Sequence, residues 1–185
     1  MMSALKAAGT LDQTLVIFSS DNGFLLHEHG LYDKRAMYEE SIRIPLLMRH
    51  PTLVRRGVID DMTLNIDLAP TLLQMIGAPG AEETQGISLL PAMQGRRRNK
   101  RSVFFYQYDR ETPHSTPSLM GVRTPDWKLV RYREEGQLHE LYNVKKDPFE
   151  MQNLFESPRA RKERDRLGRE LTRLAPLAKV PEPIR

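Results

Sequence analysis

The feature that most constrains the fold of this chain is an apolar run that stops abruptly in a polar loop. Residues 14–18 read TLVIF, which is nearly continuously apolar and rich in β-branched side chains. Such a run is typical of a central strand covered on both faces, as in a parallel α/β sheet. The loop that follows, Ser-Ser-Asp-Asn-Gly, stands just beyond the carboxyl end of the strand, where ligands bind in such sheets. We therefore expect an α/β fold with Asp21 and Asn22 as candidate site residues.

The segments around this strand fit an α/β region. Gly9 and Gly77 stand where helices are expected to end, because glycine adopts the left-handed conformation of a helix C-terminus without strain. Asp67 is placed to cap the second of these helices. The elements expected here are a helix end at residues 3–8, a loop at 24–36, a helical turn at 37–41, a strand at 44–49 and a helix at 67–76.

The second half of the sequence has a different pattern, which begins near a polar break at residues 93–102. Short stretches rich in Val, Phe and Tyr, separated by turn residues, predict antiparallel strands. Leu167, Leu171 and Leu174 recur at spacings of four and three, which predicts one apolar face of a helix at residues 158–176. The expected strands are residues 103–106, 120–123, 127–132 and 139–143.

Composition limits the chemistry available to this chain. The 185 residues contain no cysteine, which excludes disulfides, thiolate zinc sites and cysteine nucleophiles among them. No run approaches the ~20 apolar residues of a membrane span. The first residues have too short an apolar stretch for a secretory signal, so the sequence carries no visible address.

The formal net charge is +4, and much of the basic excess lies in residues 96–101 and 159–173. A basic cluster can bind nucleic acid or another anionic polymer. Neither stretch is interleaved with aromatic side chains or belongs to a known nucleic-acid module. A solvated surface is therefore the favoured interpretation and no nucleic-acid partner is expected. Nucleic-acid binding through residues 96–101 stays open as an alternative that arginine replacements would test.

Asp21 and Asn22 place a carboxylate beside an amide carbonyl, the hard oxygen ligands that calcium or magnesium accepts. An Asp-Asn-Gly turn without any ligand is the alternative, and these residues alone do not decide. Calcium typically takes about six to eight oxygens, so these two residues can supply only part of a site. The other acidic residues are scattered and form no second cluster at a strand end.

The continuation of the sequence favours the metal-site interpretation. A His-Glu-His-Gly loop at residues 27–30 is followed by Lys34 and by YEESIRIP at residues 38–45. Three longer motifs come after them: NIDLAPTLLQMIGAP, GVRTPDWKLVRY and ELYNVKKDPFEMQNL. In this order the motifs resemble the C-terminal half of the sulfatase family, within the alkaline phosphatase superfamily. The resemblance covers essentially the whole chain.

The resemblance implies roles for four residues. Asp21 and Asn22 would be two ligands of a divalent metal, usually calcium. Lys34 would contact the sulfate or the bridging ester oxygen, as a positive charge placed where negative charge develops. His29 would either approach the substrate or hydrogen-bond within its loop, and it is carried beside Lys34 as a second catalytic and substrate-binding candidate.

Three neighbouring residues are expected to act on the loop rather than in the chemistry. Glu39 and Arg43 would brace the loop as a buried pair. His27 stands where the family commonly has glycine, and this departure would affect the mouth of the pocket.

The resemblance also implies an architecture. Residues 1–95 would be the C-terminal part of the sulfatase catalytic α/β domain, a partial alkaline-phosphatase-like parallel or mixed sheet flanked by helices. Residues 96–185 would form a C-terminal α+β subdomain with a small antiparallel sheet and a terminal helix. An incomplete sheet exposes an edge, so self-association through that edge is expected.

One family feature is absent from this sequence. Sulfatases depend on a formylglycine nucleophile made from Cys or Ser in a Cys/Ser-x-Pro-x-Arg motif, which lies in the family's N-terminal half. Ser157-Pro158-Arg159 lacks the required spacing. The expectation is therefore a sulfatase acting on aryl or carbohydrate sulfate esters, whose site is completed by an N-terminal half. This chain by itself is expected to be inactive.

Two other functions stay open. A non-catalytic truncated remnant or binding protein would also lack the nucleophile. A phosphate or phosphonate ester hydrolase of the same superfamily would share the scaffold, but such relatives tend to carry His after the strand-end Asp, so Asn22 favours sulfate. Family members are commonly periplasmic, secreted or lysosomal, and the sequence gives no further indication of compartment.

Overall fold

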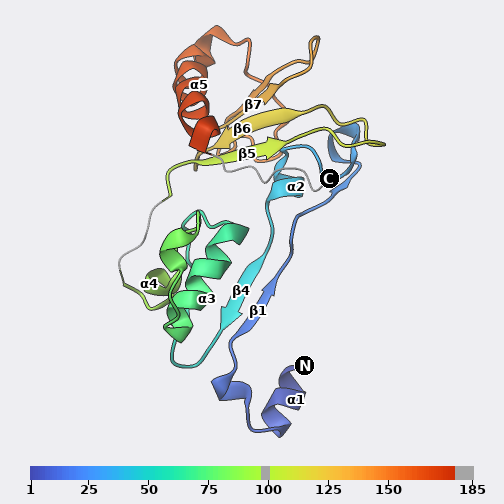
Figure 1. The fold of residues 1–185 in the computed structure, drawn as a ribbon. Coiled ribbons are helices and arrows are strands. Elements are labelled where there is room, and N and C mark those ends of the chain that lie inside the picture. Colours follow the sequence, from blue (N-terminus) through green and yellow to red (C-terminus); the bar gives the residue numbers. More distant parts are fainter. Residues whose placement is uncertain (97–100, 178–185) are drawn as a thin grey trace. The chain divides into compact units, whose positions relative to one another are not determined.

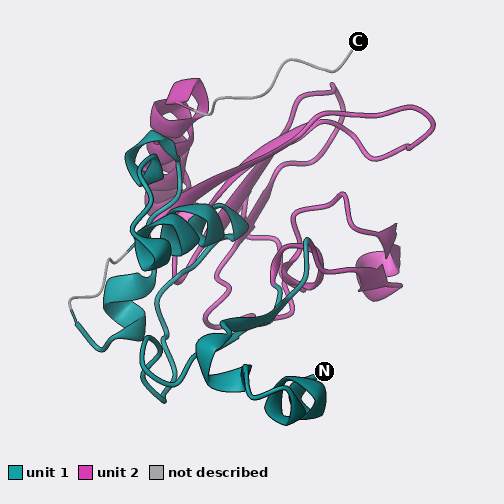
Figure 2. Ribbon diagram, turned by 60° about the horizontal axis from the view of Figure 1, so that its bottom comes forward, with its two compact units in different colours: residues 1–21, 44–101 teal, residues 22–43, 102–185 magenta. Residues whose placement is uncertain are grey.

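The computed structural model of this protein describes residues 1–96 and 101–177. The chain forms two compact units (Figures 1 and 2): unit 1 is residues 1–21 with 44–101, and unit 2 is residues 22–43 with 102–185. Most of the basic stretch at 96–101 lies outside the described residues. The assignment of residues 1–95 to a catalytic domain and of 96–185 to a subdomain remains a prediction.

The helices and the second strand expected in unit 1 are confirmed. Gly9 and Gly77 have φ angles of 69° and 67°, the left-handed conformation expected of residues that end helices. The described elements of unit 1 are α1 (Met2–Ala7), β1 (Val16–Ser19), β4 (Leu46–Arg49), α3 (Leu68–Ile76) and α4 (Leu90–Met93), with 3-10 turns at Leu11–Gln13, Asn65–Asp67 and Ala81–Glu83.

Strand β1 pairs with β4 in antiparallel orientation, with Val16 opposite Arg49. Within the described residues, the part of unit 1 expected to form a parallel or mixed sheet contains one antiparallel pair of strands. Phe18 and Leu47 have 63% and 59% of their surface exposed, so β1 is not covered on both faces as its apolar sequence predicts. The reason is that each strand has a single neighbouring strand within residues 1–96 and 101–177.

Asp67 does not act as the helix cap that its position predicts. Its side chain is fully buried and makes no capping hydrogen bond to α3. Its two oxygens instead accept hydrogen bonds of 2.8 Å from the backbone N–H groups of Leu64 and Ile87. Arg101 donates to both oxygens at 2.6 and 2.7 Å. Two amides and a bidentate guanidinium satisfy this carboxylate, which ties three separate segments of unit 1 together.

The segment at residues 24–36 in unit 2 is more regular than the loop that its sequence predicts. It forms a small antiparallel hairpin from β2 (Leu25–Leu26) and β3 (Tyr32–Asp33), which enclose a 3-10 turn at Glu28–Gly30. Strands of two residues are too short to show a period-two pattern, so neither strand is predictable from periodicity. The expected helical turn follows as α2 (Glu39–Ile42).

The rest of unit 2 confirms the predicted α+β pattern. Four strands form an antiparallel sheet in the order β5-β6-β7-β8. They are β5 (Phe104–Tyr108), β6 (Leu119–Arg123), β7 (Lys128–Tyr132) and β8 (Glu140–Tyr142), followed by α5 (Arg161–Leu174), which has 3-10 turns on either side at Pro158–Ala160 and Ala175–Leu177. Of the helices that the structure describes, none is both long enough and apolar enough to cross a membrane.

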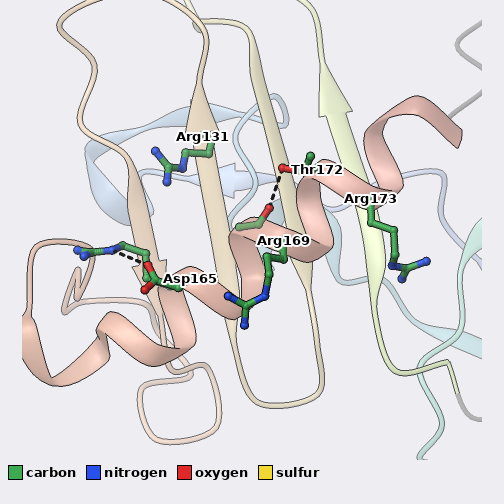
Figure 3. A pocket seen from close by; sticks show the side chains of 7 residues that line it. Arg131, Asp165, Arg169, Thr172 and Arg173 are labelled. Carbon is green, nitrogen blue, oxygen red and sulfur yellow. Dashed lines mark hydrogen bonds and ion pairs between the residues drawn. The ribbon is translucent and has the colours of Figure 1, made fainter.

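One face of the four-stranded sheet packs on α5. Leu167 and Leu171 are buried, as the leucine spacing predicts, while Asp165 and Arg169 of the same helix are exposed (Figure 3). The buried cluster between helix and sheet consists of Val122, Leu129, Leu141, Ala160, Leu167 and Leu171.

The other face of the sheet packs on the segment that leads into α2. Met37, which is 2% exposed, contacts Leu119 and Val130 there. Gly121 makes this contact possible, because a Cβ atom at this position would lie 2.2 Å from Sδ of Met37 and 2.8 Å from the carbonyl oxygen of Leu129. The sheet is therefore buried on both faces within unit 2.

Replacing Gly121 by alanine is expected to lower the free energy of unfolding by about 1–3 kcal/mol, the usual cost of overpacking. The backbone carbonyl of Leu129 cannot move aside without breaking the sheet, although Met37 can. Gly168 on α5 is the matched control, because a Cβ there meets nothing within 4 Å. Gly168→Ala is expected to stabilise by about 1 kcal/mol through helix propensity. Urea unfolding of both variants checks the contrast, and equal effects would contradict it.

Candidate functional site

The polar loop after β1 begins in unit 1 and continues into unit 2. Asp21 is exposed and is the last residue of the first segment of unit 1. Its backbone oxygen accepts a hydrogen bond of 2.7 Å from Nδ2 of Asn65, and its Oδ1 accepts one of 3.4 Å from Oγ of Ser20. Asn65 belongs to the NIDLAP motif, which is thereby connected to the strand-end loop.

Asn22 and Lys34 lie together in unit 2. The Nζ of Lys34 donates a hydrogen bond of 3.2 Å to Oδ1 of Asn22, although the two residues are 12 positions apart. The Nδ2 of Asn22 donates to the carbonyl oxygen of Gly23 at 2.7 Å, which orients the amide so that its oxygen faces Lys34. Two of the predicted site residues are therefore brought into contact, and Lys34 is exposed.

Ser41 holds both ends of this loop. Its carbonyl oxygen accepts a hydrogen bond of 2.8 Å from the N–H of Gly23, and its hydroxyl donates to the carbonyl oxygen of Lys34. Glycine is required at position 23, because a Cβ atom there would lie 2.0 Å from the carbonyl oxygen of Glu40. Ser41 is 2% exposed, so the loop that carries Lys34 starts from a buried anchor.

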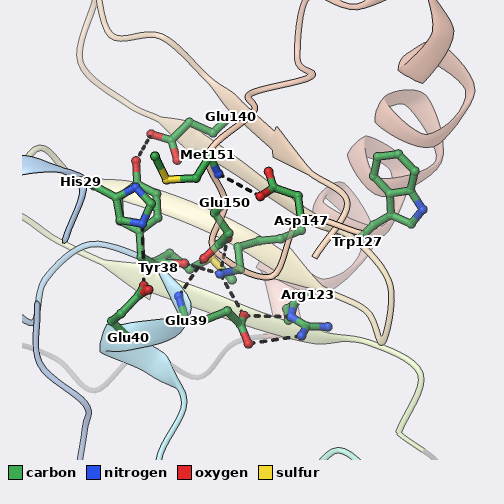
Figure 4. Close-up of polar contacts among 12 residues, drawn as sticks. His29, Tyr38, Glu39, Glu40, Arg123, Trp127, Glu140, Asp147, Glu150 and Met151 are labelled. Atoms are coloured by element: carbon green, nitrogen blue, oxygen red, sulfur yellow. Dashed lines mark hydrogen bonds and ion pairs between the residues drawn. The ribbon is translucent and has the colours of Figure 1, made fainter. Parts of the chain in front are cut away.

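The predicted buried pair of Glu39 and Arg43 is wrong, because Glu39 pairs with other basic residues. Arg43 is exposed, and its backbone N–H is hydrogen-bonded to the carbonyl oxygen of Glu39 in α2. The carboxylate of Glu39 accepts two hydrogen bonds from Arg123, at 3.0 and 3.2 Å, and lies 3.0 Å from Nζ of Lys128 (Figure 4). Sequence spacing alone cannot show whether the partner of Glu39 is the arginine four positions later or one 84 positions away.

Lys128 is the centre of this network and is fully buried. Its Nζ donates to the carbonyl oxygen of Met37 at 2.7 Å and lies 2.7 Å from Oε1 of Glu150, which is also buried. The other oxygen of Glu150 accepts the backbone N–H of Glu39 at 2.8 Å. One ammonium group therefore lies at ion-pair distance from two carboxylates and donates a hydrogen bond to a carbonyl, and such pairing is how proteins tolerate buried charge.

Burial would raise the pKa of Glu39, but the hydrogen bond from Arg123 and the charges of Lys128 and Arg123 outweigh it and lower the pKa to about 2. Burial raises the pKa of Glu150 even though Lys128 opposes this effect. Glu39 is therefore the ionised partner of both basic groups. Three motifs of the sequence meet here. Glu39 belongs to YEESIRIP, Arg123 and Lys128 belong to GVRTPDWKLVRY, and Glu150 belongs to ELYNVKKDPFEMQNL.

A second polar cluster lies beside the first. The hydroxyl groups of Tyr38 and Tyr132 donate to Oε1 of Glu140 at 3.2 and 2.9 Å. Burial raises the pKa of Tyr38 to about 12, with the nearby charge of Glu140 adding to the effect. Burial also raises the pKa of Glu140, against the hydrogen bonds from the two tyrosines. Both tyrosines are thus kept as neutral donors.

His29 contacts Tyr38 and Glu40, and no contact between His29 and Lys34 is found among the described residues. Its ring is stacked on that of Tyr38, with centroids 3.8 Å apart and an interplanar angle of 11°. Its Nε2 lies 3.7 Å from Oε2 of Glu40 (Figure 4). His27 and His29 have φ angles of 82° and 55°, so both bend the turn between β2 and β3. The contacts of His29 are of the kind that hold a loop in shape.

The predicted metal ligands are one carboxylate and one neighbouring amide carbonyl, at Asp21 and Asn22. These are hard oxygen donors that suit calcium or magnesium. Among the residues that the structure describes, no group of three or more His, Asp or Glu side chains is arranged to hold a metal ion. The two residues therefore fit a share of a calcium site but not a whole one.

Comparison with known proteins places this chain in a family. Residues 27–176 match the family described as N-sulphoglucosamine sulphohydrolase, C-terminal. The chain is 35% identical, over 160 residues, to an N-acetylglucosamine-6-O-sulfatase of Bacteroides thetaiotaomicron, a match that covers 84% of this chain and 29% of that protein. It is also 32% identical to a choline-sulfatase of Rhizobium meliloti, covering 86% of this chain and 30% of that one. The chain thus spans less than a third of the length of either relative.

Solved structures agree. The chain superposes with a TM-score of 0.88 and 34% identity on a protein solved in complex with its substrate D-glucosamine-2-N,6-O-disulfate, covering 98% of this chain and 38% of that one. It shares a fold, at 24% identity and a TM-score of 0.81, with a phosphonate monoester hydrolase of Agrobacterium radiobacter; this match covers 95% of this chain and 37% of that one. The chain belongs to the sulfatase family.

Proposed function

We propose that this chain supplies part of the active site of a sulfuric ester hydrolase and that residues outside these 185 complete it. The observation that carries the proposal is the hydrogen bond of Lys34 to Asn22, because it joins the predicted sulfate-contacting cation to a predicted metal ligand. The length of the relatives supports the second part, since the chain corresponds to only 29% and 30% of the first two.

Lys34 would act on the sulfate group. An ammonium group is a compact charge with three N–H donors, which suits a sulfate oxygen or the bridging ester oxygen. Negative charge grows on these oxygens as the S–O bond breaks, and a cation fixed in advance stabilises that charge. The support for such a fixed position is the bond from Ser41 to the carbonyl oxygen of Lys34, on a buried residue that α2 carries.

Asp21 and Asn22 would hold one side of a divalent metal, for which calcium suits their oxygen atoms. When bound, such an ion polarises the sulfate and offsets its negative charge. The remaining ligands, and the formylglycine nucleophile that the family resemblance implies, would come from residues outside this chain. His29 is kept as a second substrate contact, although its stacking on Tyr38 favours a role in shaping the loop.

The substrate class that the relatives favour is a sulfated sugar. The relative with 35% identity is named for N-acetylglucosamine 6-O-sulfate and one solved neighbour holds a glucosamine disulfate, whereas the relative with 32% identity is named for choline sulfate, which is not a sugar. We therefore propose a carbohydrate sulfate ester for this chain, with aryl sulfates as simple test substrates.

The test is to read the coding sequence upstream of the Met1 codon and to express whatever open frame continues into this chain. A frame with Cys/Ser-x-Pro-x-Arg should give an enzyme that hydrolyses an aryl sulfate and glucosamine 6-sulfate. In that enzyme Lys34→Met is expected to lower kcat/KM by about 10²–10³, as removal of an electrostatic stabiliser does. Lys146→Met, an exposed lysine on another loop, is the control and should leave kcat/KM unchanged.

Each alternative has its own outcome in this experiment. An in-frame stop without the nucleophile motif would leave a non-catalytic remnant, and self-association through the exposed β1–β4 edge would then be its expected property, to be measured by sedimentation. Faster hydrolysis of a phenyl phosphonate than of the aryl sulfate would assign the chain to the second alternative. The similarity to the phosphonate hydrolase extends to the fold alone, whereas Asn22 favours sulfate.

A further inference from the structure

A basic groove between α5 and strand β7 takes no part in the site described above. It is shallow and largely open to solvent, has a volume of about 580 Å³ and lies within unit 2. Arg131 lines it from β7, and the other lining residues all come from α5 (Figure 3). The lining residues are Arg131, Arg164, Asp165, Gly168, Arg169, Thr172 and Arg173, so four guanidinium groups face one carboxylate.

Two of these arginines are held close together on one aromatic ring. The guanidinium carbons of Arg131 and Arg164 lie 4.7 and 5.3 Å from the centroid of Phe155. Burial lowers the pKa of Arg131, and the positive charge of Arg164 lowers it further. The ring positions two like charges side by side, and an anion placed between them would relieve their repulsion.

The carboxylates of the segment do not neutralise the groove. Asp165 lies 3.8 Å from Arg161 and 3.9 Å from Arg164, and Arg173 pairs with Glu170 at 2.6 Å. The negative charge of Glu156 also acts on Arg131, but within the described part of the chain neither Arg131 nor Arg169 forms an ion pair with a carboxylate. Guanidinium groups without a carboxylate ion pair can bind sulfate or phosphate oxygens with paired N–H donors.

Gly168 opens the middle of the groove. A Cβ atom at this position would meet nothing within 4 Å, so the absence of a side chain leaves space rather than permitting a close contact. Glycine costs a helix interior about 1 kcal/mol relative to alanine. The groove therefore keeps an opening at a position where every residue except proline would favour the helix more than glycine does.

The length of the groove indicates several anionic groups in a row. The rise of about 1.5 Å per helical residue separates Arg164 from Arg173 by about 13 Å along α5. A single sulfate is far shorter. Nucleic-acid bases bind on exposed aromatic faces, but Arg131 and Arg164 lie over the ring of Phe155, and the lining residues of the groove include no aromatic side chain.

We propose that this groove binds a sulfated polysaccharide at a distance from the bond that is cleaved. Arg131, Arg164 and Arg169 would hold consecutive sulfate groups, and Gly168 would admit the sugar backbone between them. The choice of sulfate over other anions rests on the proposed function. The binding itself does not, because it requires neither metal nor nucleophile.

The test measures binding of a dextran sulfate oligosaccharide to the full chain by calorimetry at moderate salt, with unsulfated dextran as the reference ligand. Arg131→Gln with Arg169→Gln is expected to weaken binding at least tenfold, since two charge-assisted contacts are lost. Gly168→Leu should weaken binding of dextran sulfate by a similar factor. Because leucine favours the helix more than glycine does, this loss would come from a blocked groove and not from unfolding of α5. Arg159→Gln with Lys162→Gln removes the same charge from exposed positions outside the groove and should change affinity less than about twofold, since surface charge at a distance is screened.

Three results would overturn the proposal. Equal loss in the groove variant and in the Arg159 and Lys162 control would mean that net charge alone attracts the polymer. Unchanged binding in Gly168→Leu would place the ligand elsewhere. Binding of single-stranded DNA of equal charge as tight as that of dextran sulfate would remove the assignment to sulfated sugars. Polymer binding by a complete enzyme without sulfatase activity would refute the proposed function and leave the groove intact.

Discussion

Replacing Lys128 by methionine is expected to lower the free energy of unfolding by about 3–5 kcal/mol, the cost of removing one partner from a buried ion network. The substitution keeps most of the side-chain volume, so the loss comes from charge. It leaves the carboxylates of Glu39 and Glu150 facing each other without the ammonium group that lies 3.0 and 2.7 Å from them. It also leaves the carbonyl oxygen of Met37 without its donor.

The matched control for this variant is Lys145→Met. Lys145 lies 3.4 Å from Asp126, but both side chains are more than half exposed. An exposed ion pair contributes about 0–1 kcal/mol, so the control should unfold at nearly the wild-type urea concentration. Similar destabilisation by the two substitutions would contradict the buried network.

The pH dependence gives a second measurement on the same network. The pKa of Glu39 is lowered to about 2 in the folded chain, from an ordinary value of 4.5. The unfolded chain therefore binds the proton more readily, and the stability that Glu39 contributes is complete above about pH 4.5 and is lost as the pH falls towards 2. Without Lys128 the pKa of Glu39 rises, so the difference between Lys128→Met and wild type should shrink as the pH falls through this window. A constant difference would show that the loss is one of packing.

Replacing Asp67 by alanine is expected to cost unit 1 about 3–5 kcal/mol, because it leaves the charge of Arg101 buried without its partner. The side chains of Asp67 and Arg101 are 0% and 9% exposed. Two backbone N–H groups, those of Leu64 and Ile87, lose their acceptor at the same time. Hydrogen exchange should therefore accelerate at these two amides first.

The control for Asp67 lies in the same unit. Arg49 and Asp12 also lie 2.7 Å apart, but their side chains are 38% and 78% exposed. Asp12→Ala should cost less than about 1 kcal/mol, since solvent screens this pair. Retained protection of the Leu64 and Ile87 amides in Asp67→Ala would refute the assigned role of the carboxylate.

Elements with long, regular patterns were predictable from the sequence. The leucine spacing of α5, the four strands of the C-terminal sheet and the glycines that end α1 and α3 are all found, because each depends on contacts between near neighbours in the chain. The β2–β3 hairpin was missed, since strands of two residues carry no periodic signal. The roles of Asp21, Asn22, His29 and Lys34 remain predictions.

Pairing of distant polar groups was not predictable. Asp67 has the sequence position of a helix cap, yet it binds Arg101, 34 residues away. Glu39 has an arginine four residues later, yet it binds Arg123 and Lys128 from the other chain segment of unit 2. An ion pair is chosen by which charges are desolvated together, and burial is a property of the folded chain.

The sequence by itself determined the order of the elements, the family to which the chain belongs and which residues are candidates for a sulfate and metal site. Local spacing and turn chemistry carry that information, since they act within a few residues. Only the tertiary structure decided that Lys34 reaches Asn22, that Ser41 holds both ends of the intervening loop while Glu39 binds a buried lysine, and that four arginines of α5 and β7 line one groove. These arrangements depend on which segments pack together, and hydrophobic burial of the two sheet faces sets that packing rather than the polar residues themselves.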